Sequence, residues 1–152
     1  MTDSRLIEAL NARLGEELQA QAEYRAHAEL ARFWGYAKFA ERLEGVLKEE
    51  YEHASELLNR IYLLGGRPEL VQAPAQAGGD LPEALSLDHE LEVKAVAAYT
   101  LTVRLAEELG EVGTGNLLRH ILSEEEKHLV VLAGELTELE QMGEENWLAA
   151  QV

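Results

Sequence analysis

Residues 65–79, with the sequence GGRPELVQAPAQAGG, separate two long segments of helical composition. Gly65, Gly66 and Pro68 end the helical pattern before them, and residues 71–79 carry two glycines, one proline and no periodicity. Fully extended, this connection could reach roughly 50 Å. A helix of about 28 residues is roughly 42 Å long, so the connection can run beside it to the opposite end. The stretch therefore predicts that the helices before and after it run parallel.

The rest of the chain is rich in Ala, Leu and Glu and has few β-branched residues, which favours helices. We expect four long helices and a short fifth, over about residues 4–33, 36–64, 80–108, 114–142 and 144–151. Asp80 and Glu83 form a capping-box-like start for the third helix, and Gly110, Gly113 and Gly115 punctuate the turn after it. The predicted fold class is an all-α four-helix bundle with one long crossover and a short fifth C-terminal helix, in a single domain over residues 1–152.

Composition excludes several classes of function. The formal net charge of −16 argues against nucleic-acid binding, which needs a basic surface. The absence of cysteine excludes disulfides, zinc ribbons, iron–sulfur clusters and thiol catalysis. The sequence has no apolar run long enough to cross a membrane, and its N-terminus does not resemble a secretory signal. We therefore expect a soluble cytoplasmic protein that binds neither nucleic acid nor membrane.

One pattern of glutamates and histidines occurs twice. A Glu-x-x-His motif lies at residues 50–53 and again at 125–128, and in each case another Glu stands 33 positions before the motif. The midpoint of each 33-residue interval falls at a predicted turn, so in an antiparallel hairpin the lone Glu returns to the height of its motif. The i, i+3 spacing places Glu and His on one helix face. We call these six residues the Glu/His cluster: Glu17, Glu50, His53, Glu92, Glu125 and His128.

Four carboxylates and two imidazoles, with no soft sulfur ligand, suit two hard or borderline metal ions. In four-helix bundles this set forms a carboxylate-bridged dinuclear site. We expect two terminal pairs and two bridging carboxylates: Glu17 with His53, Glu92 with His128, and Glu50 and Glu125 as the bridges. Iron with dioxygen or peroxide is the natural chemistry. The alternative is that these glutamates lie on solvated helix faces, which the apolar neighbours of both histidines oppose.

Two tyrosines repeat the duplication. Tyr24 lies seven positions after Glu17, and Tyr99 lies seven positions after Glu92, so each shares a helix face with its glutamate. Each is either a hydrogen-bond partner of a ligand or an electron donor, or else an ordinary core residue. We include Tyr24 among the candidate catalytic residues. The three histidines outside the pattern are expected to be surface residues: His27, His89 and His120.

At these residues the chain resembles bacterioferritin. The similarity covers nearly the whole length and includes residues 14–18 (LGEEL), 33–35 (FWG), 64–68 (LGGRP), 124–128 (EEEKH) and 141–151 (QMGEENWLAAQ). The resemblance implies a ferritin-like fold and a ferroxidase centre, with two irons per subunit, made of the Glu/His cluster with Tyr24 beside it. It also implies a homo-oligomeric cage of twenty-four subunits that oxidises ferrous iron with dioxygen or peroxide and stores it as ferric mineral.

The chain departs from the bacterioferritin pattern at two positions. Bacterioferritins bind haem through a methionine directly after the second helix's bridging Glu, where this chain has Tyr51, and its only methionines are Met1 and Met142. We therefore expect no haem of the usual kind. The family's inner-surface iron site uses a histidine where this chain has Gly45, although Glu49 keeps the acidic position. We therefore expect electron transfer from inner-surface iron to differ from that in bacterioferritins.

Three other functions compete with this interpretation. A rubrerythrin-like di-iron peroxidase of low oligomeric state has similar ligand spacing, but it usually carries an extra Glu at the position of Ala95. A DNA-protecting mini-ferritin places its metal sites between subunits, which the duplication within one chain and the acidic charge oppose. A site loaded with zinc or manganese uses the same ligands.

Overall fold

The computed structural model describes residues 2–152, and apart from its turns and one crossover this part of the chain is helical. Its five helices are α1 (Ser4–Phe33), α2 (Ala37–Leu63), α3 (Leu81–Glu108), α4 (Val112–Met142) and α5 (Glu144–Ala149). The predicted start of the fourth helix was wrong by two residues. Of the three glycines predicted to punctuate this turn, only Gly110 adopts a positive φ, of 70°, and the helix begins before Gly113 and Gly115.

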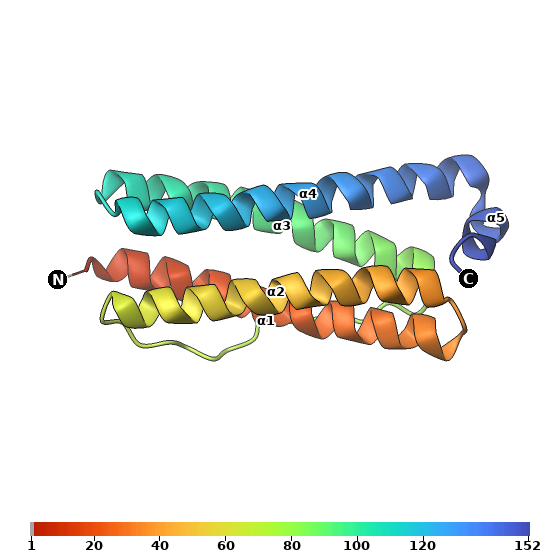
Figure 1. Cartoon of the computed structure of the whole chain (residues 1–152), viewed down its shortest axis with the longest axis horizontal. Helices are drawn as coiled ribbons and strands as arrows, with labels where there is room; N and C mark the ends of the chain where they lie inside the picture. The colour runs from red at the N-terminus through yellow and green to blue at the C-terminus, as the bar shows by residue number, and fades with distance from the viewer. Residues whose placement is uncertain (1) are drawn as a thin grey trace.

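The helices form two antiparallel hairpins, α1 with α2 and α3 with α4, packed into one bundle (Figure 1). The crossover runs along the outside of the first hairpin, so that α2 and α3 point in the same direction (Figure 1). The predicted four-helix bundle with a long crossover and a short fifth helix is therefore confirmed.

The start of α3 shows how local sequence sets a helix end. The Asp80 side chain accepts a hydrogen bond from the Glu83 amide at 2.8 Å, as a capping residue does. The Glu83 carboxylate reaches back to the Gly79 amide, also at 2.8 Å, rather than to the Asp80 amide. The capping box thus closes on the residue before the cap and anchors the end of the crossover.

The apolar core consists of two clusters at opposite ends of the bundle. One contains Leu10 and Leu57, and the other contains Phe39 and Trp147. On each long helix, the members of the Glu/His cluster lie between residues of the first apolar cluster and residues of the second. The sequence therefore places the Glu/His cluster in one polar layer halfway along the bundle, with an apolar layer above it and another below it.

Helix α5 closes one end of the bundle against the start of α2. The backbone oxygen of Gln151 accepts hydrogen bonds from the Lys38 and Phe39 amides, at 3.0 and 3.4 Å. These bonds satisfy amides at a helix start where Tyr36 provides no side-chain cap. Trp147 is fully buried and meets the Phe39 ring edge to face, with 5.8 Å between centroids. The C-terminal segment is thus part of the core.

The crossover is fastened along α1 by residues spaced in steps of four or eight. They are Asn11, Gly15, Glu23 and His27, which bind the backbone amides of Glu69, Ala73, Gln76 and Gly78 at 2.8, 3.1, 2.7 and 2.9 Å. The close approach at Gly15 requires glycine, because a Cβ there would lie 2.7 Å from the Val71 oxygen. The crossover is therefore held over most of the length of α1.

The expectation that His27 is a surface residue was wrong. His27 is 1% exposed, and its Nδ1 lies 2.8 Å from the Asp88 carboxylate. Because the Gly78 amide donates to Nε2, the ring proton resides on Nδ1 and is donated to Asp88. Both partners are distant in sequence, on the crossover and on α3, which is why no local pattern revealed them. His89 is half-buried and His120 is exposed.

Replacing His27 by alanine should destabilise the fold locally and globally. The change leaves a buried carboxylate and a buried amide without partners, which costs about 3 kcal/mol of unfolding free energy. Denaturant unfolding should show this loss, and amide hydrogen exchange should accelerate first at residues 76–78. His89→Ala, at the next position after Asp88, is the control and should change neither quantity appreciably. Equal stability of the two variants would contradict the role given to His27.

Candidate metal centre

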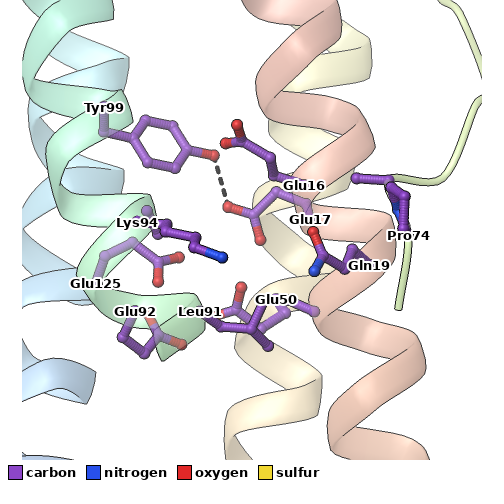
Figure 2. Close-up of a pocket in the computed structure, with 13 residues that line it drawn as sticks. Glu16, Glu17, Gln19, Glu50, Pro74, Leu91, Glu92, Lys94, Tyr99 and Glu125 are labelled. Atoms are coloured by element: carbon purple, nitrogen blue, oxygen red, sulfur yellow. Dashed lines mark hydrogen bonds between the residues drawn. The ribbon is translucent and has the colours of Figure 1, made fainter. Parts of the chain in front are cut away.

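The structure brings the six members of the Glu/His cluster together in the middle of the bundle. All four long helices contribute, and no member is more than 8% exposed. Figure 2 shows the four carboxylates Glu17, Glu50, Glu92 and Glu125 converging on one region between the helices. The helical spacings identified in the sequence thus lead to one compact group of charges.

The cluster divides into two overlapping sets of four possible ligand atoms. One set comprises Glu17, Glu50, His53 and Glu125, and the other comprises Glu50, Glu92, Glu125 and His128. In each set the four atoms lie within 4.8 Å of one another. Glu50 and Glu125 belong to both sets, and each histidine belongs to one. The geometry is that of two adjacent cation positions sharing two carboxylates.

Most of the inward-facing polar atoms make no hydrogen bond of good geometry within the protein, although several lie close to one another. They are Glu17 Oε2, Glu50 Oε1, His53 Nδ1, Glu92 Oε2, both carboxylate oxygens of Glu125, and His128 Nδ1. Buried polar atoms are normally paired, because an unpaired one costs a few kcal/mol. Carboxylate oxygens and imidazole nitrogens left without partners at one place form a donor set that fits divalent cations.

The electrostatics of the cluster reflect its crowding. Burial and the charges of Glu17, Glu125 and Glu92 raise the pKa of Glu50 well above its usual range. Burial and, to a smaller extent, the contact with Glu125 likewise raise the pKa of Glu92. For Glu125 burial acts in the same direction, but contacts with Glu92 and both histidines outweigh it and hold the pKa well below the usual range. In the protein alone, the carboxylates therefore share protons and positive partners rather than all being free anions.

The two histidines hold protons that a cation would have to displace. Burial alone would lower the pKa of His53, but contacts with Glu125 and Glu17 raise it to about 11. The pKa of His128 is likewise raised to about 11, against burial, by Glu125 and Glu92. The closest approaches of Nδ1 are 2.8 Å to Glu125 for His53 and 3.1 Å to Glu50 for His128. Both rings thus present Nδ1 to the carboxylates that the two sets share.

Two further glutamates, whose contacts with the histidines the sequence analysis did not predict, orient the histidines from outside the cluster. The Nε2 of His53 donates to Glu124 at 2.6 Å, and the Nε2 of His128 donates to Glu49. A carboxylate on the far nitrogen fixes the ring and leaves Nδ1 to face inward. Each of these glutamates comes from the opposite hairpin. A signal was available, because each directly precedes a shared glutamate of the cluster, Glu50 or Glu125.

The two tyrosines of the duplicated pattern also bind across the bundle. The Tyr24 hydroxyl on α1 donates to Glu92 on α3 at 2.7 Å, and the Tyr99 hydroxyl on α3 donates to Glu17 on α1 at 2.5 Å. Both rings are buried. The sequence left open whether these tyrosines contact the cluster or are ordinary core residues, and the structure shows that both donate a hydrogen bond to one of its glutamates. Each tyrosine bonds to a glutamate of the opposite hairpin.

Cavities reach the cluster from two sides. One of about 350 Å³ lies between α1, α3 and the crossover, and its lining includes Glu16, Lys94 and Pro74 beside the carboxylates (Figure 2). Another of about 460 Å³ lies between α2 and α4 and includes Glu49 and His128. Small solutes therefore have one route toward the four carboxylates and another toward His128. No helix within residues 2–152 has the length and apolar character needed to span a membrane.

Comparison with known proteins gives the family. Residues 7–142 match the family described as "Ferritin-like domain". The chain belongs to the ferritin-like family. A bacterial ferritin of Pseudomonas aeruginosa is 34% identical over 148 residues, which cover 97% of this chain and 96% of that protein. A bacterioferritin of Brucella melitensis is 33% identical over 146 residues, covering 95% and 91%.

Among solved structures, a bacterioferritin of Rhodobacter capsulatus superposes with a TM-score of 0.96. It is 28% identical in sequence, and the match covers 99% of this chain and 95% of that one. That protein is described as having a metal-free dinuclear site and a haem iron in a crystallographic special position. The resemblance to bacterioferritin is thereby confirmed, and the buried Glu/His cluster is compatible with a di-iron site of this family.

Proposed function

We propose that this protein is a ferroxidase and iron-storage protein, which oxidises Fe²⁺ with dioxygen or peroxide and keeps the ferric product inside an oligomeric cage. The observation that carries the proposal is the pair of overlapping four-ligand sets sharing Glu50 and Glu125. The match to bacterial ferritins and bacterioferritins over nearly the full chain gives independent support.

In this proposal each residue has a defined role. Two irons would supply the redox chemistry when bound, and the Glu/His cluster would hold them: Glu17 and His53 at one, Glu92 and His128 at the other, with Glu50 and Glu125 shared. Glu124 and Glu49 keep both imidazoles in orientation. Tyr24 holds Glu92 from the opposite hairpin and lies close enough to the site to donate an electron. The apolar layers above and below close the centre along the bundle axis.

We propose assembly into a cage of twenty-four subunits, as the resemblance to bacterioferritin implies, and the outer surface of the bundle offers apolar side chains for the contacts. Large apolar side chains that the single chain leaves exposed occur on all four long helices: Phe33, Tyr51, Tyr62, Leu63, Val93, Leu101, Val130 and Val131. Neighbouring subunits in an assembly would cover such side chains. Tyr51 is 64% exposed at the position where the family carries its haem-binding methionine, and we propose that this protein binds no haem through a methionine pair.

The test is oxidation of Fe²⁺ by the purified protein, followed by size analysis. We expect rapid formation of the ferric product and a particle close to twenty-four subunits. The double variant Glu50→Ala, His128→Ala should slow the fast phase of oxidation by at least about 100-fold, since it removes a shared carboxylate and a terminal imidazole. Glu52→Ala, an exposed residue between the ligands of α2, is the matched control and should behave as the wild type.

Two outcomes would refute parts of the proposal. Unchanged oxidation by the double variant would exclude the Glu/His cluster as the ferroxidase site. A dimeric protein that consumes peroxide but accumulates no mineral would favour the rubrerythrin-like alternative. Metal analysis of the protein as isolated distinguishes iron from zinc or manganese.

A further inference from the structure

The centre is built twice from residues 75 positions apart. Glu17, Glu50, His53 and Tyr24 have their counterparts at Glu92, Glu125, His128 and Tyr99. The distance from each histidine to its terminal glutamate repeats as well. The Nδ1–Oε1 separation is 3.6 Å between His53 and Glu17, and also 3.6 Å between His128 and Glu92. The phenol that acts on each terminal glutamate is supplied by the other half of the duplication.

Tyr99 engages one oxygen of Glu17 and leaves the other available. Its hydroxyl lies 2.5 Å from Glu17 Oε1, whereas Glu17 Oε2 is buried without a partner. The counterpart is arranged in the same way, with Tyr24 on Glu92 Oε1 and Glu92 Oε2 without a partner. Since the terminal torsion of a glutamate is broad and nearly two-fold, a free carboxylate could present either oxygen or both to a cation. A phenol on Oε1 restricts that choice.

We propose that Tyr99 is a positioning residue that restrains Glu17 at its metal position by holding Oε1, which leaves Oε2 free for a cation, and that Tyr99 and Tyr24 together make the two metal positions equivalent. The proposal rests on the proposed function, because it assigns Glu17 to a bound divalent cation. It concerns the hydroxyl of Tyr99 and not its ring. The ring packs in the apolar cluster around Leu10 and Leu57, a role that phenylalanine would also fill.

The environment of Tyr99 suits a permanent hydrogen-bond donor. Tyr99 is 1% exposed, and burial followed by the charge of Glu17 raises its pKa well above the ordinary value of a phenol. The hydroxyl therefore keeps its proton at neutral pH and donates it to Glu17 rather than binding a cation as phenolate. Tyr24 is held in the same state by burial and by Glu92.

The experiment is a titration of the purified, assembled protein with Co²⁺. Unlike Fe²⁺, Co²⁺ should not be oxidised by dioxygen at this site, and its visible absorption reports its coordination. Wild type should bind two Co²⁺ per chain with similar affinities. Tyr99→Phe should lower one of the two affinities roughly tenfold and alter part of the cobalt spectrum. Tyr24→Phe should do the same at the other position, and the double variant should lose affinity at both. Tyr51→Phe, an exposed tyrosine, is the control.

The outcomes separate this proposal from the proposed function. If wild type binds no Co²⁺ pair, the dinuclear assignment itself fails. If wild type binds two Co²⁺ and Tyr99→Phe matches it in both affinities and spectrum, the positioning role of Tyr99 is overturned. Circular dichroism and thermal unfolding of Tyr99→Phe establish that any loss is not one of folding.

A second measurement needs no Tyr99 variant. Cation binding draws electron density from Glu17 and Glu92 and weakens both phenol hydrogen bonds, so the near-ultraviolet absorbance of both buried tyrosines should change. We expect a tyrosine difference signal on Co²⁺ addition to the wild type and about half of it in Tyr24→Phe. Complete loss of the signal in Tyr24→Phe would show that Tyr99 does not respond to the metal and would overturn the proposal.

Discussion

Glu125→Gln is expected to weaken cation binding at both metal positions by about 100-fold or more, because its carboxylate belongs to both four-ligand sets. The amide keeps the shape of the side chain but removes the charge and one of two oxygen acceptors. Glu17→Gln should instead weaken one position and spare the other, since Glu17 belongs to a single set. Isothermal titration with Co²⁺ gives the number and affinity of the sites in each variant.

The matched control for this comparison is Glu126→Gln, the exposed neighbour of Glu125 on α4. It carries the same change in net charge but faces away from the cluster, so both sites should remain. Identical behaviour of Glu125→Gln and Glu17→Gln would contradict the shared role of Glu125. Loss of binding in the Glu126→Gln control would point to the net charge rather than the site.

Cation binding should also depend steeply on pH. In the protein without metal, His53 and His128 have pKa values of about 11, so both imidazoles are protonated at neutral pH. A cation that takes Nδ1 must expel that proton, and affinity therefore rises with pH by up to about tenfold per unit for each proton released. We expect Co²⁺ to release about one proton or more per ion between pH 6 and 8, measured with an indicator in weak buffer. An affinity independent of pH over that interval would contradict these protonation states.

The same protonation states determine how stability varies with pH before metal binds. A histidine whose folded pKa is raised stabilises the folded state fully below its unfolded pKa of about 6.5, and this contribution is lost as pH rises toward the folded value. The raised pKa values of Glu50 and Glu92 act in the same direction. The unfolding free energy of the metal-free protein should consequently fall as pH rises from about 7 to 9. Bound cations should reverse this trend.

The parts of the structure that the sequence predicted are those governed by local chemistry and by spacing. Helix ends follow from Asp80 and Gly110, and the direction of the crossover follows from the reach of residues 65–79. The height of the site follows from two equal 33-residue intervals centred on turns. Because an α-helix has a fixed rise, a distance along the chain becomes a position in space once the turns are known.

The parts that the sequence did not predict depend on contacts between hairpins. His27 has its partners on α3 and on the crossover, and no spacing within α1 indicates either one. Glu49 and Glu124 each bind a histidine of the opposite hairpin. Tyr24 and Tyr99 each donate to a glutamate of the opposite hairpin in the same way. Such pairs depend on the rotation of one helix face toward another, which a count of residues does not provide. The duplication marks Glu49 and Glu124 as repeated residues, 75 positions apart, but does not say which histidine each one contacts.

The crosswise contacts of the two hairpins have a consequence for their alignment. Tyr24 to Glu92, Tyr99 to Glu17, His53 to Glu124 and His128 to Glu49 each join one hairpin to the other. Sliding one hairpin past the other by a single helical turn, about 5.4 Å, would break all four at once, whereas leucine layers can re-form after such a shift. The polar layer thus specifies the vertical register of a bundle whose apolar layers alone leave it ambiguous.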